Sequence, residues 1–236
     1  MRNRTQRRVS RIAIAAIAAV SLAACSPGRG GNGAGGGPSQ VGSDGATNIG
    51  GSVLQTQIDS LPKATLTAAE TAGLLRMREE EKLAHDIYVA LNDKWHLQVF
   101  TNISAAEQTH TDAVKILLDR YGLSDPATGN AAGVFTNPDL QSFYPTLVDQ
   151  GSGSQIAALT VGATIEDLDI ADLQSLTTTT PDISLVYTNL EKGSRNHLRA
   201  FTKQLTSSGA TYIPTHITQA AYDAIIAGAV ERGAAG

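Results

Sequence analysis

Apolar residues recur at steps of three and four along four segments of the chain, and this spacing predicts four amphipathic α-helices. The signals that delimit these helices are a capping box at Thr67–Glu70, a turn around Asn92–His96, Tyr121–Gly122, Ser154, Thr180–Pro181 and Gly209. Shorter helices are expected over about 138–149, within the long connection between the second and third helices, and over about 219–231. We therefore expect an all-α protein built as a four-helix bundle with a long crossover.

Each of the four apolar seams is interrupted midway by residue types that bind metal ions. These residues are Glu81 in the first seam, Glu107 and His110 in the second, Glu166 and Asp169 in the third, and His197 in the fourth. Glu107 and His110 are separated by one helical turn, so their side chains share a face, as in bundles where one helix supplies two ligands to a metal. Glu79 and Glu80 flank Glu81, and a slight rotation of the helix would turn Glu80 inward instead.

The turns between the helices are placed so that these polar residues lie at equal depth. Residues equally distant from a tight antiparallel turn lie side by side, and residue 94, midway between Glu81 and Glu107, falls in the Asn92–His96 turn. The midpoint of Glu166 and His197 falls on the Thr180–Pro181 turn in the same way. Both helical hairpins therefore predict a common polar layer.

Such a layer needs positive charge. A buried ionised group without a partner costs several kcal/mol, and six of them would exceed the stability of an ordinary domain. Four carboxylates and two imidazoles suit iron, manganese or zinc, and two divalent ions would balance the four negative charges. The alternative is a bundle with a hydrated polar seam and no metal.

The same residues resemble a known family. Glu on the first helix, Glu107-x-x-His110 on the second, Glu on the third and His on the fourth are similar to the ferritin-like superfamily. The sequences around Glu81, Glu107, Glu166 and His197 look more closely like an uncharacterised family of bacterial and archaeal ferritin-like domains. Glu166-x-x-Asp169 is similar to the paired acids on the third helix of rubrerythrin-like peroxidases.

The resemblance implies a four-helix bundle with a dimetal centre over about 70–225. It also marks Tyr88, seven residues after Glu81, as a candidate catalytic residue that would serve as a redox or hydrogen-bonding neighbour of the metals. One position departs from the pattern: Ser194-x-x-His197 replaces Glu-x-x-His, so the second metal position lacks a carboxylate.

The N-terminus has the features of a bacterial lipoprotein signal. A basic segment precedes an apolar run that ends in Leu22–Ala–Ala–Cys25, which predicts a signal peptide over 1–24 and lipidation of Cys25. Five of the 18 basic residues lie in 1–24, so 13 remain against 22 acidic residues, and this balance argues against nucleic acid as a partner. We expect a flexible Gly-rich tether over 25–59 and a ferritin-like helical domain over 60–236.

Together these features predict a membrane-tethered protein, exported from the cytoplasm, that binds one or two iron or manganese ions. The expected activity is oxidoreduction with oxygen or peroxide, and the alternatives are a non-catalytic metal-binding protein or a metal-free helical adaptor of the cell envelope. Cys25 is the single cysteine, so no rubredoxin-like site is available and electrons would come from an external donor.

Overall fold

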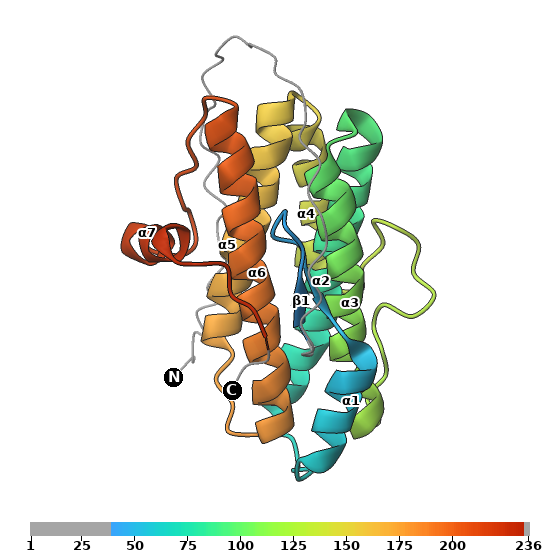
Figure 1. The fold of residues 1–236 in the computed structure, drawn as a ribbon. Coiled ribbons are helices and arrows are strands. Elements are labelled where there is room, and N and C mark those ends of the chain that lie inside the picture. The colour runs from blue at the N-terminus through green and yellow to red at the C-terminus, as the bar shows by residue number, and fades with distance from the viewer. Residues whose placement is uncertain (1–38, 234–236) are drawn as a thin grey trace, which may run out of the picture.

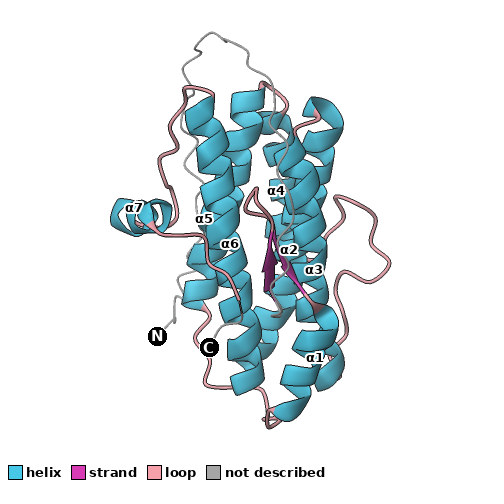
Figure 2. Cartoon of the chain, in the orientation of Figure 1, coloured by secondary structure: helices cyan, strands magenta, loops and turns pink. Residues whose placement is uncertain are grey.

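A computed structural model describes residues 39–233, which are mostly helical (Figures 1 and 2). In this part of the chain the elements, in order, are β1 (Ser39–Val41), β2 (Thr47–Ile49), α1 (Gly51–Ser60), α2 (Ala68–Trp95), α3 (Gln98–Tyr121), α4 (Pro138–Gly151), α5 (Gln155–Ser175), α6 (Pro181–Ser207) and α7 (Gln219–Ala227). The expected all-α bundle is confirmed. Helices α2, α3, α5 and α6 form the bundle, and α4 lies in the connection between α3 and α5, packed against α2 and α5.

The helix ends follow from the local sequence. The Thr67 side chain accepts from the Glu70 amide and the Glu70 side chain accepts from the Thr67 amide, which is the predicted capping box. Helix α2 closes at His96 in the left-handed conformation, and α3 closes at Gly122, whose φ is 69°. The sharp end at His96 produces the tight connection between α2 and α3, whereas Gly122 ends α3 before the long connection to α4.

Two apolar clusters fill the bundle, one towards each end. The first surrounds the aromatic rings of Tyr88, Phe100 and Phe201, which lie 5.3–5.8 Å apart between centroids. The second contains Leu74 and Leu117, both fully buried, together with side chains from the C-terminal end of α5 and the N-terminal half of α6. The polar layer lies between the two clusters.

The N-terminal segment differs from the expected tether over 25–59. From residue 39 onward it forms the antiparallel β1–β2 hairpin and α1, and Leu54 and Ile58 of α1 are fully buried. The hairpin lies between α3 and α6 (Figure 1), where side chains of both helices hydrogen-bond to it. Its three-residue strands are too short to give a periodic apolar pattern, so they could not be predicted from the sequence.

The C-terminal helix ends at Ala227, earlier than the expected 219–231. Beyond it the chain returns to α6, where Glu231 accepts hydrogen bonds from Arg195 and Arg199. The predicted signal peptide and Cys25 lie outside the described residues. Within the described range, the helices lack the combination of length and apolar character that a membrane span requires.

Candidate metal centre

The residues predicted from the four seams meet in the middle of the bundle. Side chains from α2, α3, α5 and α6 converge there, and those of Glu81, Glu107, Glu166, His110 and His197 are almost completely buried. Each of the four long helices therefore contributes at least one group to a single interior layer.

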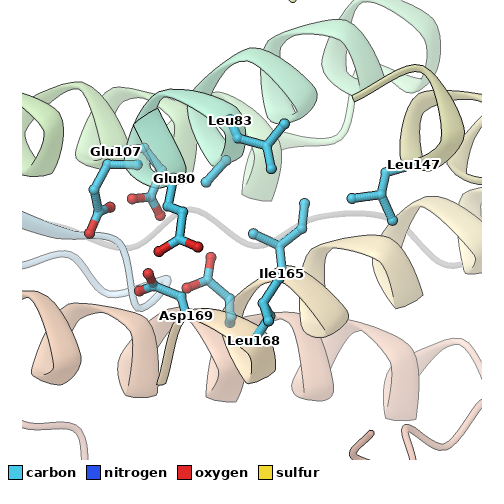
Figure 3. A pocket seen from close by; sticks show the side chains of 10 residues that line it. Glu80, Leu83, Glu107, Leu147, Ile165, Leu168 and Asp169 are labelled. Carbon is cyan, nitrogen blue, oxygen red and sulfur yellow. The ribbon is translucent and has the colours of Figure 1, made fainter. Parts of the chain in front are cut away.

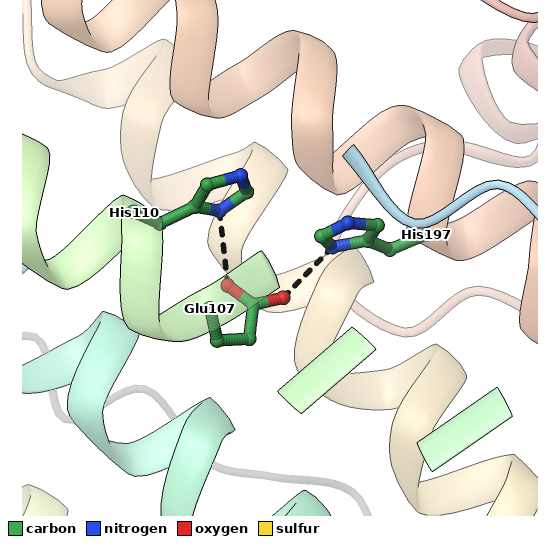
Figure 4. A group of neighbouring side chains, drawn as sticks. All are labelled: Glu107, His110 and His197. Atoms are coloured by element: carbon green, nitrogen blue, oxygen red, sulfur yellow. Dashed lines mark ion pairs between the residues drawn. The ribbon is translucent and has the colours of Figure 1, made fainter. Parts of the chain in front are cut away.

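Glu107 lies at the centre of this layer, between two imidazole rings (Figure 4). Its Oε2 atom is 3.0 Å from His110 Nδ1, and its Oε1 atom is 2.7 Å from His197 Nδ1. The two rings are stacked, with centroids 5.2 Å apart. One ligand atom from each of the three residues lies within 4.8 Å of the others, as a shared metal ion requires.

Two further carboxylates flank the histidines. Glu81 Oε2 is 3.4 Å from His110 Nδ1, and Glu166 Oε2 is 3.7 Å from His197 Nδ1. Each imidazole therefore faces Glu107 and one carboxylate of its own. Among the described residues, the ion pairs of these three glutamates are formed with the two histidines only.

Several of the converging atoms have no hydrogen-bond partner. Glu81 Oε1, Glu107 Oε1, His110 Nδ1 and His197 Nδ1 are all buried and unsatisfied within the described structure. Buried polar atoms are normally hydrogen-bonded, and an unpaired group marks a place where an ion or water belongs.

A small cavity adjoins the glutamates (Figure 3). Its polar wall consists of five acids, Glu80, Glu81, Glu107, Glu166 and Asp169, and its apolar wall includes Leu83, Leu147, Ile165 and Leu168. The cavity measures about 20 Å³, which is room for one water-sized ion or molecule. Leu147 comes from α4, so the crossover helix closes this side of the site.

Asp169 does not reach the histidines. It is partly exposed, lines the cavity, and accepts a hydrogen bond from the hydroxyl of Ser194. It therefore faces Ser194, which lies one helical turn before His197 on α6.

The three consecutive acids of α2 have different surroundings. Glu81 faces His110, whereas Glu80 is ion-paired at 2.6 Å with Arg76. Glu79 accepts hydrogen bonds from the amides of Thr136 and Asn137 and holds the start of α4. Of the two alternatives for the inward position, Glu81 is the residue that contacts the histidines.

Tyr88 lies beside the site, on the side of the aromatic cluster. Its hydroxyl donates to Glu166 Oε1 at 2.6 Å. Burial and the charge of Glu166 raise the pKa of Tyr88 well above its ordinary value, so the phenol remains a hydrogen-bond donor.

The pKa values of the buried glutamates and histidines differ strongly from their ordinary values. Burial raises the pKa of Glu81 to about 8 and that of Glu166 to about 7, with repulsion from Glu107 acting in the same direction. Burial also acts to raise the pKa of Glu107, but the two imidazoles hold it well below its usual range. Burial acts to lower the histidine pKa values, yet the carboxylates raise that of His197 to about 9 and that of His110 well above its ordinary value. Without a metal, the layer therefore retains protons to balance its charge.

Two contributions were missed by sequence reasoning. The main chain of Thr47, in β2, contacts both histidines. Gly193, on α6, provides the space that the His110 ring occupies, because a Cβ atom at this position would overlap the ring. The role of Gly193 could have been suspected, because a glycine inside a predicted helix often has a packing reason. The contacts of Thr47 could not, because main-chain contacts leave no pattern in the sequence.

These features define a mostly helical domain with a buried acid–histidine layer. Residues 70–229 match the family described as an uncharacterized protein domain, DUF2202, and the chain belongs to this family. It is 51% identical over 178 residues to the uncharacterized protein MJ0754 of Methanocaldococcus jannaschii, over 75% of this chain and 96% of that protein. The crystal structure of hypothetical protein MJ0754 from Methanococcus jannaschii has a TM-score of 0.72 at 50% identity, covering 73% of this chain and 99% of that chain. The expected resemblance is thus confirmed as an uncharacterised domain family with an archaeal member.

Proposed function

We propose that this protein is a ferritin-like metal-binding protein that holds one or two transition-metal ions, iron or manganese, in the bundle core. The candidate ligands are Glu81, Glu107, His110, Glu166 and His197, with Asp169 at the edge of the site. The observation that carries the proposal is the group of buried, unsatisfied nitrogen and oxygen atoms directed at one another from different helices. Carboxylate and imidazole donors suit these metals.

Distances within the layer support the fit. Two donors bound to one metal at about 2.1 Å lie roughly 3.0–3.4 Å apart in octahedral or tetrahedral geometry. His110 Nδ1 lies 3.0 Å from Glu107 and 3.4 Å from Glu81, within this range. His110 Nδ1 can therefore share one ion with either glutamate without large movements.

The proposed activity is oxidoreduction of oxygen or peroxide. A bound iron or manganese centre would supply the redox chemistry, and electrons would come from an external donor. The chain contributes a cavity of the size of a small molecule, an aliphatic wall that limits the entry of water, and the Tyr88 hydroxyl as a donor to Glu166. The cavity size favours a small substrate.

A metal-free adaptor is the second candidate. Its support is that protonated histidines could neutralise the glutamates, since the ion pairs of the layer already join these groups. A non-catalytic metal-binding protein would share the centre and lack turnover. Metal content separates the adaptor from the other two, and consumption of peroxide or oxygen by the Fe(II)-loaded protein separates the enzyme from the non-catalytic form.

The deciding experiment is elemental analysis of the purified protein and of its Glu107→Gln variant. Glu107 touches both histidines, so its replacement should reduce bound metal to less than about a tenth of the wild-type content. Glu191→Gln, at a partly exposed position on α6, is the matched control and should bind as the wild type does. Equal metal content in the Glu107→Gln variant would disprove the centre.

We also propose that the protein is exported and anchored to the cell membrane, facing away from the cytoplasm. The support is the basic and apolar segment over 1–24 and the single cysteine at position 25. Lipidated Cys25 would be the contact with the membrane.

A further inference from the structure

The main chain of one hairpin residue contacts both histidines of the layer. The amide of Thr47 donates to His197 Nε2 at 3.0 Å, and the carbonyl of Thr47 is 2.8 Å from His110 Nε2. Both contacts are buried, and both are made on the side of the rings opposite Glu107.

The two contacts have opposite polarity. A backbone carbonyl only accepts, so His110 must carry a proton on Nε2, and the Nδ1 of its neutral ring presents a lone pair to Glu107 and Glu81. A backbone N–H only donates, so His197 Nε2 must present its lone pair to Thr47, and the proton of its neutral ring lies on Nδ1. One residue thus assigns opposite tautomers to two histidines in similar positions.

The hairpin is held in a way that fixes these contacts. Thr47 pairs with Val41 across the hairpin, and its N–H and C=O point to the bundle rather than to β1. Asn196 of α6 donates to the Thr47 hydroxyl at 3.0 Å, and the neighbouring Ile49 amide donates to Thr109 of α3 at 2.9 Å. The hairpin is therefore attached to both helices that carry the histidines.

We infer that Thr47 is a positioning residue that makes the histidines unequal, so that the centre binds one metal ion through His110 and His197 is not a ligand. Binding a metal through Nδ1 of His197 while Nε2 accepts from Thr47 would require an imidazolate anion. The distances agree, because the 2.7 Å between His197 Nδ1 and Glu107 Oε1 is shorter than the separation of two donors on one metal. Ser194, on the same helix as His197, supplies no carboxylate for a second ion. The inference rests on the proposed metal function.

Zinc is a suitable probe because it is diamagnetic and accepts the same donors. We expect one zinc ion per chain, measured on the full chain by elemental analysis after dialysis. His110→Gln should weaken zinc binding by more than about 100-fold, beyond the loss caused by an outer-shell partner. His197→Gln, whose amide can accept from Thr47 and face Glu107, should keep one zinc ion and lose less than about 10-fold in affinity. Two zinc ions per chain, or equal losses in the two variants, would overturn the inference.

Nitrogen NMR of labelled histidine tests the tautomers separately from metal binding. In the apo protein at alkaline pH, where the rings are neutral, His197 should carry its proton on Nδ1 and His110 on Nε2. In the zinc-loaded protein, His110 should show the shift of a metal-bound Nδ1 and His197 should remain unchanged. A His197 proton on Nε2 in either state would overturn the inference, whereas absence of zinc binding with the expected apo tautomers would reject the proposed function alone.

Replacement of Thr47 tests the residue itself. Thr47→Pro removes the amide proton without removing a bond to β1, and should allow the His197 proton to move to Nε2. Thr47→Val keeps both main-chain contacts, loses only the hydroxyl, and should retain the wild-type spectrum. Identical histidine spectra for the two variants, in proteins that remain helical by circular dichroism, would show that Thr47 does not set the tautomers.

Discussion

At the scale of single residues, the position of His110 depends on the absence of a side chain at Gly193. A Cβ atom there would overlap the imidazole ring. We predict that Gly193→Ala displaces the ring and weakens metal binding by at least about 10-fold, although alanine is favoured over glycine within helices by about 1 kcal/mol. Titration with Zn(II) or Mn(II), together with a thermal melt, measures both effects.

A matched control uses a glycine with free space around it. Gly51 begins α1, and a Cβ atom added there would meet no heavy atom within 4 Å. Gly51→Ala should therefore bind metal as the wild type does. If Gly193→Ala does the same, His110 does not need the space that Gly193 provides.

The side chains of the site could be predicted to different degrees. Glu81, Glu107, Glu166 and the two histidines interrupt apolar seams, so their inward direction followed from helical spacing alone. Asp169 lies on the same face by spacing, yet the structure leaves it partly exposed and bound to Ser194. Thr47 could not be found at all, because it acts through main-chain N–H and C=O groups that every residue type except proline possesses.

At the scale of elements, the four long helices followed from periodicity, since each carries apolar residues at steps of three and four that are buried in the bundle. The turn after α2 predicts that Glu81 lies level with Glu107, and His110 Nδ1 lies 3.4 Å from Glu81 Oε2 and 3.0 Å from Glu107 Oε2. The β1–β2 hairpin did not follow from the sequence. Its strands are held in place by contacts with α3 and α6, such as the hydrogen bond that the Ser39 hydroxyl donates to Asn189. Contacts between residues so far apart in the chain leave no local pattern in the sequence.

At the scale of the whole molecule, Cys25 is the proposed point of membrane attachment. We predict that Cys25→Ala abolishes lipid labelling and moves the protein from the membrane fraction to the soluble fraction, because it removes the single candidate for acylation. Cell fractionation and incorporation of a labelled fatty acid measure the two effects. Ser26→Ala leaves the cysteine in place and is the control, and membrane retention of both variants alike would rule out the anchor.

The stability of the whole domain should depend on pH in the absence of metal. The pKa of Glu81 rises from 4.5 to about 8 on folding and that of Glu166 from 4.5 to about 7. Between pH 4.5 and the raised pKa of each glutamate, the folded chain retains a proton that the unfolded chain has released. The stability that these two glutamates contribute is therefore complete below about pH 4.5 and is lost as the pH rises.

The apo protein should therefore melt at progressively lower temperature as the pH is raised from about 5 to about 9. Below about pH 4.5 the opposite trend begins, because Glu107 has a lowered pKa and the stability it contributes is lost on protonation. The metal-loaded protein should show a smaller decline above pH 5, since metal ions replace the protons and binding to the folded state adds stability of RT ln(1 + [L]/Kd). Calorimetry of the apo and loaded forms in matched buffers measures both curves, and an apo protein whose melting temperature equals that of the loaded form at every pH would favour the metal-free bundle.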